Sequence, residues 1–418
     1  MSKRRFHMTD TGGNRATAVS AGRLYRGWLV TGACFVMAYF AWGVVFYGHG
    51  FYIAQLGDRH GWSTSLVSTA VSVFYIVGVA SAVVVGRVID RFGSRWVACY
   101  GALATGLSVA ALGRLDAPWQ LFAAYVVMGS AYPALATAAI SGSLVPWFER
   151  RLGLALGLAL TGASVGGATV VPVMVVSSTT VGFSTTVAGI GLLVVVTVVP
   201  LVLLFVRRPR DAGETTAEKS ATVAGEPVAP IGIIEFLKLP RFWKITLASS
   251  LALGAQVGFL THQIPALAMP LDLPRAAYAV SITALAAVFG RFALGALSAR
   301  FPLSVLAAGC YGLQAVGLMV IAESDGILLL YGASALAGFV VGAIVMLPPL
   351  LLSNAFGARS YSTAYGLTNA CMFTFVGIAT GAAGFMRDYS GSYAAALWLL
   401  AAMHVLGMAV ILWPQGRR

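Results

Sequence analysis

The chain has 418 residues, of which 59% are apolar and only 10% are charged, whereas about 25% are charged in a soluble globular protein. A mean hydropathy of +0.85 excludes an ordinary soluble enzyme and an intrinsically disordered chain. The net charge of +13 does not indicate a nucleic-acid partner, because the basic residues lie in short segments between apolar runs, as in membrane proteins.

Runs of about 20 apolar residues predict membrane-spanning helices. Twelve such runs lie at 27–50, 64–86, 95–114, 118–145, 152–175, 181–206, 244–269, 276–298, 302–322, 327–354, 361–385 and 391–414. The sequence therefore predicts an all-α membrane protein with two six-helix bundles. The predicted segments are a tail at 1–26, a bundle at 27–206, a polar linker at 207–240, a second bundle at 241–414 and a tail at 415–418.

The basic residues are distributed unequally between the two sides of the predicted membrane protein. Twenty-two of the 27 Lys and Arg residues lie in the two tails, the linker with its flanks, and the even-to-odd loops. Because basic loops stay in the cytoplasm, we expect both termini and the linker to be cytoplasmic. We predict a multi-pass protein in the lipid bilayer of the plasma membrane, which is the inner membrane if the cell is bacterial.

The four cysteines are too far apart to form a metal site or a redox pair. No glycine loop of the Walker type and no HExxH or GxSxG motif is present. We therefore expect no metal, no cofactor and no enzymatic activity, and an intramembrane enzyme is the least favoured class.

The two predicted bundles repeat at a constant offset of 209 residues. The matching pairs include Gly86 and Gly295, Arg91 and Arg300, Gly129 and Gly338, and Arg150 and Arg359. Two parallel six-helix halves are the layout of one large class of transporters, in which the halves rock about a site near the middle of the membrane.

The loop segment GRVIDRFGSR (86–95) resembles the loop signature of the major facilitator superfamily. This resemblance implies a twelve-helix transporter in two pseudo-symmetric bundles, with Asp90, Arg91 and Arg95 acting as a gate at the membrane surface. Asp90 is suited to pair with a basic residue or to cap a neighbouring helix in one conformation only. The alternative is an ordinary basic turn. The basic pair Arg150 and Arg151 in the corresponding later loop is expected to belong to the same gate.

The segment 147–167 resembles the fifth-helix signature of the monocarboxylate porter family, which includes oxalate–formate exchangers. Its Gly153, Gly157, Gly162 and Gly166 form two small-xxx-small pairs, which predict close packing against a helix. We expect that helix to belong to the other half.

Arg291 is the most specific single candidate for a substrate-binding residue. It lies within the predicted helix 276–298, and no Asp or Glu lies in the interior of any predicted helix. A cation at that depth costs about 3 kcal/mol on insertion scales. Its neighbours Ala284, Ala287 and Gly295 are small, which predicts open space beside it. A lone cation in such a space indicates an anion site, and the porter family carries an essential arginine in this helix. The alternatives are bonding to backbone carbonyls and snorkelling to an edge.

Other candidates are weaker. Tyr132, Asn369 and Phe46 are predicted to contact the substrate, although ordinary packing explains them as well. Ser164 is a further polar candidate. His262, followed by Gln263 and Pro265, is predicted to carry a coupling proton or to serve a structural role near the outer end of its helix.

The favoured function is proton-coupled secondary transport of a small organic monoanion, such as lactate or pyruvate, by alternating access. Family members that exchange dianions have a second cation in the eleventh helix, and 360–385 has no Lys or Arg. We expect the protein to work as a monomer with its anion and protons as partners. The alternative is an exporter or exchanger of oxalate-type anions or drug-like molecules.

Overall fold

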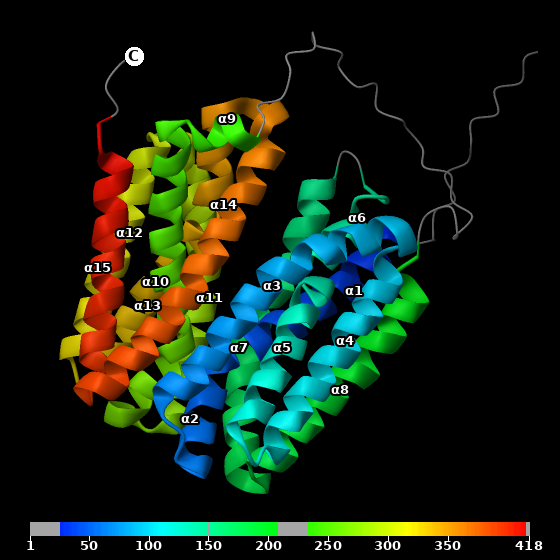
Figure 1. The fold of residues 1–418 in the computed structure, drawn as a ribbon, viewed down its shortest axis with the longest axis vertical. Helices are drawn as coiled ribbons and strands as arrows, with labels where there is room; N and C mark the ends of the chain where they lie inside the picture. Colours follow the sequence, from blue (N-terminus) through cyan, green and yellow to red (C-terminus); the bar gives the residue numbers. More distant parts are fainter. Residues whose placement is uncertain (1–25, 149–150, 208–232, 415–418) are drawn as a thin grey trace, which may run out of the picture.

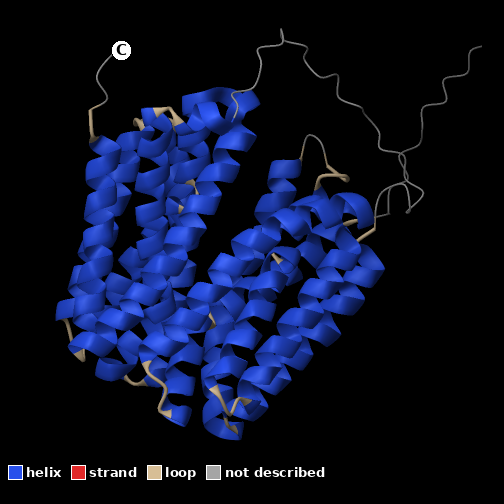
Figure 2. Ribbon diagram, in the orientation of Figure 1, coloured by secondary structure: helices blue, strands red, loops and turns tan. Residues whose placement is uncertain are grey.

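The computed structural model describes residues 26–148, 151–207 and 233–414. These residues are helical almost throughout, with no β-strand among them (Figure 2). Twelve helical spans in the described chain are long and apolar enough to cross a membrane. The predicted fold class, a multi-pass all-α membrane protein, is confirmed.

The first half forms one bundle in Figure 1. Its first span consists of three consecutive helical pieces, and its fourth span of two. The elements are α1 (Arg26–Phe40), η1 (Ala41–Phe46), α2 (His49–His60), α3 (Thr64–Phe92), α4 (Ser94–Ala111), η2 (Leu112–Arg114), α5 (Pro118–Leu135), α6 (Thr137–Leu144), α7 (Leu152–Val181) and α8 (Phe183–Phe205).

The second half forms the other bundle (Figure 1). The elements are the short α9 (Ile233–Leu237), followed by α10 (Pro240–Leu271), α11 (Leu273–Ser298), α12 (Leu303–Glu323), α13 (Ile327–Ile344), α14 (Leu347–Ser390) and α15 (Tyr393–Leu412). Gly357 has a φ of 69° inside α14, so this element comprises two helices joined at a kink.

Local sequence signals explain where the helices begin and end. Ser63 caps α3, because its side-chain oxygen accepts a hydrogen bond from the Leu66 amide at 3.3 Å. Gly93 separates α3 from α4 with a φ of 86°, and Gly182 separates α7 from α8 with a φ of 83°. Glycine adopts these positive φ values without steric cost, so the chain turns back sharply between antiparallel helices.

The first span continues to His60, ten residues beyond the predicted end at 50. Its middle piece, η1, is a π-helix, in which the Tyr47 amide donates to the carbonyl oxygen of Trp42 at 2.8 Å. The wider turn brings Gly43 against α7, where a Cβ atom would lie 2.7 Å from a methyl carbon of Val170. The span is therefore a helix with a locally widened turn at mid-depth.

The glycines of α7 pack within their own half. A side chain at Gly162 or Gly166 would collide with the backbone of Phe35 and Tyr39 in the first span, and Gly153 and Gly157 have open space. The prediction that these glycines pack against the other half is wrong. Small residues allow backbones to approach closely wherever two helices meet, and here they tighten a single bundle.

Among the described residues, the two halves meet mainly through three pairs of elements, namely α3 with α14, α7 with α11, and α2 with α10. We call the end of the bundles where α8 ends and α9 begins the linker side. Figure 1 shows the halves close together near α2 and further apart at the linker side.

Candidate functional site

Arg291 lies on α11 at the contact with α7 of the other half. Its Nη1 donates a hydrogen bond to the Ser164 hydroxyl at 3.0 Å, and Ser164 is only 1% exposed. Arg291 itself is half-buried, and it forms no ion pair with any described residue. The guanidinium therefore lies within the membrane span with donors left for an anion.

The depth and surroundings of Arg291 differ from the prediction. It lies seven residues before the end of α11, which is about 10 Å from the linker-side end rather than in the middle. Ala284 and Ala287 are fully buried, because the backbone of α11 packs closely on Gly342 of α13. The expected open space at these two alanines is absent, so the accessible side of Arg291 is the one that faces α7.

Aromatic side chains from the first half lie next to this contact. Tyr47 is buried, and its ring packs against Gly167 of α7, three residues after Ser164. The Tyr132 ring lies 5.8 Å from that of Trp42 and 5.4 Å from that of Phe74. The hydroxyls of Tyr47 and Tyr132 form no hydrogen bond with a described residue, so both retain hydrogen-bonding capacity.

Phe46 and Asn369 have less direct positions. Phe46 is half-buried at the end of η1, with its ring 5.4 Å from that of Tyr47. Asn369 is half-buried on α14, and its amide makes no hydrogen bond within the described chain. Phe46 thus borders the aromatic group, whereas no hydrogen bond of the described residues joins Asn369 to Arg291.

His262 lies at a contact between the halves on the side opposite the linker. Its Nε2 lies 3.0 Å from the carbonyl oxygen of Thr380 on α14, and 3.4 Å from the Ser68 hydroxyl on α3. Since a carbonyl oxygen only accepts, Nε2 carries the hydrogen. His262 is therefore oriented by its own half and faces a serine of the other.

Further polar contacts close the halves on that same side. The carboxylate of Asp388, at the end of α14, accepts hydrogen bonds from the backbone amides of Thr64 and Ser65 at 3.2 and 2.6 Å. The Ser72 hydroxyl donates to the carbonyl oxygen of Gly377 at 2.6 Å. We call Asp388 and its two amide partners the α3 latch. Asp388 both caps the helix and complements its dipole.

The predicted gate residues lie at the linker side of the first half. Asp90 and Arg91 are exposed at the end of α3. Arg95 donates to the carbonyl oxygen of Leu203 on α8 at 2.5 Å, which braces the first bundle internally. Arg151 is exposed before α7, and Arg150 lies outside the described residues.

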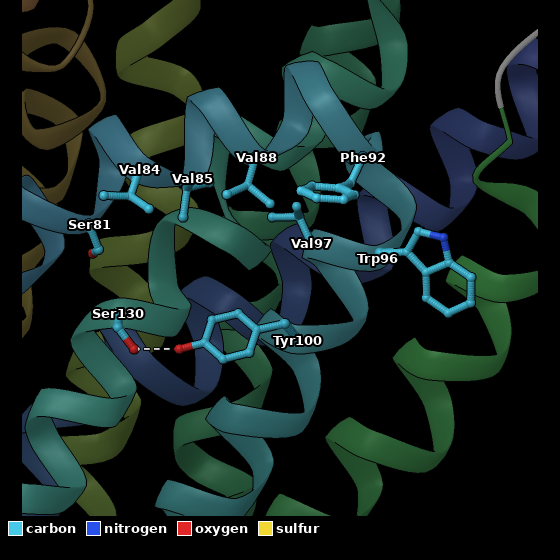
Figure 3. Close-up of a pocket in the computed structure, with 9 residues that line it drawn as sticks. All are labelled: Ser81, Val84, Val85, Val88, Phe92, Trp96, Val97, Tyr100 and Ser130. Carbon is cyan, nitrogen blue, oxygen red and sulfur yellow. Dashed lines mark hydrogen bonds between the residues drawn. The ribbon is translucent and has the colours of Figure 1, made fainter.

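A pocket of about 490 Å³ on the first half does not fit a polar substrate. Valine and aromatic side chains of α3 and α4 line it, including Val84, Val88 and Trp96 (Figure 3). Its only internal polar contact in the figure joins the Tyr100 and Ser130 hydroxyls at 2.7 Å. Such an apolar surface is suited to lipid chains rather than to an anion.

A second pocket, of about 520 Å³, lies between the halves beside the α3 latch. It is lined by residues of α2, α10 and α14, among them Asp58 and Arg387, and by the loop that holds Trp62. It is therefore separate from the Arg291 contact.

The sequence alone does not reveal the partners or surroundings of several residues. Ser164 is one small polar residue among many in α7, and no spacing marks it as the partner of Arg291. Tyr47 is one of several aromatic residues in the first span, and no motif singles it out. His49, which is completely buried among aromatic rings, carries no motif that would single it out.

Two pseudo-symmetric six-helix bundles that meet near the middle of the membrane are the architecture of one large class of transport proteins. The sequence matches the Major Facilitator Superfamily over residues 31–382, and the chain belongs to that superfamily. The finer resemblance to monocarboxylate porters is not tested by this match.

The relatives are distant. The chain is 27% identical over 165 residues to the MFS-type transporter pynF of Aspergillus niger, covering 40% of this chain and 38% of that protein. The chain thus spans well under half the length of this relative. It is 25% identical over 371 residues to an uncharacterized 38 kDa protein in the 23S RNA operon of Thermoproteus tenax, covering 87% and 89%.

Solved structures show the same fold. The nucleoside transporter NupG superposes with a TM-score of 0.73 at 12% identity, covering 94% of this chain and 100% of that chain. A bacterial homolog of the human lysosomal transporter Spinster, in an inward-facing and unoccupied conformation, gives 0.67 at 12% identity, covering 94% and 96%. At such identities the likeness concerns the fold alone.

Proposed function

We propose that the protein is a secondary transporter of a small organic monoanion, such as lactate or pyruvate, which binds at Arg291. One observation carries the proposal, namely a half-buried guanidinium at the contact between the halves that has no acidic partner among the described residues. A guanidinium offers two parallel donors to a carboxylate. Tyr47, which packs on α7 three residues from Ser164, and Tyr132 are the further hydroxyls that we assign to the site.

We expect monoanions to be transported in clear preference to dianions. One cation neutralises one carboxylate, and a second carboxylate in the same space would remain unpaired, which is costly in a low-dielectric site. Uptake of lactate or pyruvate into proteoliposomes should therefore exceed uptake of oxalate or malonate by at least about tenfold. A preference for the dianions would contradict the proposal and favour an oxalate-type exchanger.

The contacts described here support an alternating-access cycle. The hydrogen bonds that join the halves within the described chain run from Asp388, at the side opposite the linker, to Arg291. If the linker side is cytoplasmic, this arrangement is the inward-open state. Arg291 then makes the interhalf hydrogen bond that lies nearest the cytoplasm. The state that opens to the other side requires these bonds to break.

The orientation is tested by a cysteine in the linker. With 22 of 27 basic residues on the linker side, Thr216→Cys should stay unlabelled by a membrane-impermeant maleimide in intact cells and become labelled after permeabilisation. The unsubstituted protein measures the reaction of the four native cysteines. Labelling of Thr216→Cys in intact cells, above that background, would reverse the orientation.

Asp90 is proposed as part of the gate at the linker side, as its loop signature predicts. Asp90→Asn should change the transport rate several-fold and leave the dissociation constant of the anion nearly unchanged, because a gate biases conformations without touching substrate. Proteoliposome uptake and equilibrium binding measure the two quantities separately. Loss of binding with an unchanged rate would exclude this role.

Proton coupling belongs to the proposal as well. His262 is the residue that the sequence favours for it, and its place beside Ser68 supports a role at the contact between the halves. Because its Nε2–H is already held by Thr380, protonation would add a second donor at Nδ1, which has no partner in the described chain.

A further inference from the structure

The apolar pocket of about 490 Å³ is a groove between α3 and α4, and Ser130 of α5 also lines it (Figure 3). Phe92, Trp96 and Tyr100 line the groove and are exposed. Because α4 packs mainly on α5 and α8 of its own half, the groove lies away from the contact between the halves. These exposed residues belong to membrane-spanning helices, so the groove opens toward lipid.

The polar groups along the groove already have partners within the protein. The Tyr100 and Ser130 hydroxyls share a hydrogen bond at 2.7 Å (Figure 3), and the Ser81 hydroxyl donates to the carbonyl oxygen of Val77 at 2.6 Å. The rest of the lining consists of valines and aromatic rings. Such a groove offers apolar contact along its length, which suits an acyl chain.

The length of the groove matches one leaflet of a bilayer. Its lining on α3 runs from Ser81, near the middle of that helix, to Phe92 at the linker-side end. Eleven helical residues separate the two, which corresponds to about 16 Å at 1.5 Å per residue. Half of a hydrocarbon core is about 15 Å thick. A chain lying in the groove would therefore belong to a lipid of the linker-side leaflet.

Two guanidinium groups flank the linker-side end of the groove. The Cζ atom of Arg91 lies 5.2 Å from the centre of the Phe92 ring, and that of Arg95 lies 5.5 Å from the Trp96 ring. Both rings line the groove. Arg95 uses Nη2 to hold the carbonyl oxygen of Leu203, whereas its buried Nε has no hydrogen-bond partner in the described chain. The apolar groove thus ends at cations, at the depth of lipid headgroups.

We propose that the groove binds one anionic phospholipid of the linker-side leaflet, with an acyl chain between α3 and α4 and its phosphate at Arg91 and Arg95. The segment 86–95 contains three arginines and one aspartate, so its net charge complements an anionic headgroup. A guanidinium also offers parallel donors to phosphate oxygens. The inference is independent of the substrate that is transported.

Trp96 reports occupancy of the groove directly. The purified full-length protein is reconstituted in phosphatidylcholine vesicles that contain a small fraction of phosphatidylglycerol with brominated acyl chains, or the same fraction of brominated phosphatidylcholine. Bromine quenches a tryptophan that it contacts, and the difference from Trp96→Phe isolates the quenching at Trp96. We expect phosphatidylglycerol to quench Trp96 with an apparent affinity about tenfold above that of phosphatidylcholine.

Substitutions at the two ends of the groove separate headgroup from chain. Arg91→Gln should reduce the advantage of phosphatidylglycerol about fivefold, as expected for one basic residue at a membrane surface. Arg300→Gln is the matched control, because Arg300 is exposed at the equivalent position of the second half, and it should leave that advantage unchanged. Val84→Phe keeps every charge and fills the groove from an exposed position, so it should weaken quenching by phosphatidylglycerol several-fold. Each variant is measured with and without Trp96.

The outcomes decide between a selective site and ordinary contact with the bilayer. Equal quenching of Trp96 by the two brominated lipids would mean ordinary contact and overturn the inference. Absence of quenching by either lipid would mean that protein, such as a second copy of the chain, covers the groove, and would overturn it too. The inference also fails if Arg91→Gln and Arg300→Gln act equally, or if Val84→Phe has no effect. None of these results bears on anion binding at Arg291.

Discussion

Arg291→Ala should reduce uptake of the monoanion at least about a hundredfold, because the variant leaves a buried carboxylate without its cation. Arg291→Lys should reduce uptake about tenfold or more, since a point ammonium cannot reproduce the two parallel donors of a guanidinium. Uptake into proteoliposomes and equilibrium binding both report the effect. If the alanine variant transports normally, Arg291 does not bind the substrate.

Ser164→Ala is the matched control for this experiment. Ser164 accepts the one hydrogen bond that Arg291 donates within the described chain, at 3.0 Å. Its loss should change uptake only a few-fold, because the guanidinium and its charge remain. A defect as large as that of Arg291→Ala would indicate that the contact between α7 and α11, rather than anion binding, is what Arg291 maintains.

Asp388→Asn should shift the protein toward the state that opens on the side opposite the linker. The substitution removes the charge that caps α3 across the two halves, where the carboxylate accepts two amide hydrogen bonds. We expect a change of about tenfold in the ratio of the two states, equivalent to about 1.4 kcal/mol. The rate at which a maleimide labels Ser72→Cys in the purified protein measures this shift, because Ser72 bonds to Gly377 at the contact.

Asp58→Asn, in the same Ser72→Cys background, controls for the loss of a negative charge. Asp58 lines the same 520 Å³ pocket as Asp388 and is exposed, but it forms no hydrogen bond or ion pair with a described residue. It should leave the labelling rate unchanged. Equal acceleration by both substitutions would mean that local charge, and not the α3 latch, governs the opening.

The helices were predictable because lipid imposes a simple rule on length and polarity. The predicted starts at 64, 118, 152 and 327 coincide with those of α3, α5, α7 and α13. The first span exceeds its predicted end because its last turns are amphipathic rather than apolar. Gln55, Asp58 and Arg59 interrupt the apolar run, so hydropathy alone does not predict that the helix continues.

Packing partners were not predictable in the same way. A small-xxx-small pattern predicts that a helix packs closely on another backbone. Gly162 and Gly166 pack on the backbone of the first span and not on the other half. The small side chain of Ala287 likewise predicts open space beside Arg291, whereas α13 packs against Ala287. Both errors arise because a residue's size fixes how closely a neighbour approaches and leaves the identity of that neighbour open.

The candidate site likewise contains one residue that the sequence marks and others that only the fold brings together. Arg291 stands out in the sequence because a charge inside an apolar run is costly wherever the run packs. Tyr47, Tyr75, Tyr125 and His49 do not stand out, because aromatic residues are common in membrane helices. Only the folded chain brings His49 on α2 next to Tyr75 on α3 and Tyr125 on α5.

The π-helical turn of the first span has a mechanical consequence. Before Gly43 in the chain, α1 packs against α7 of its own half. After Gly43, Gly50 of α2 packs on the backbone of Thr261 in the other half. One continuous span is therefore attached to both bodies that must move apart. Because η1 lacks the regular bonding of an α-helix, we expect it to be the most compliant part of that span. Rocking of the halves should therefore bend the span at Ala41–Phe46, directly before Tyr47.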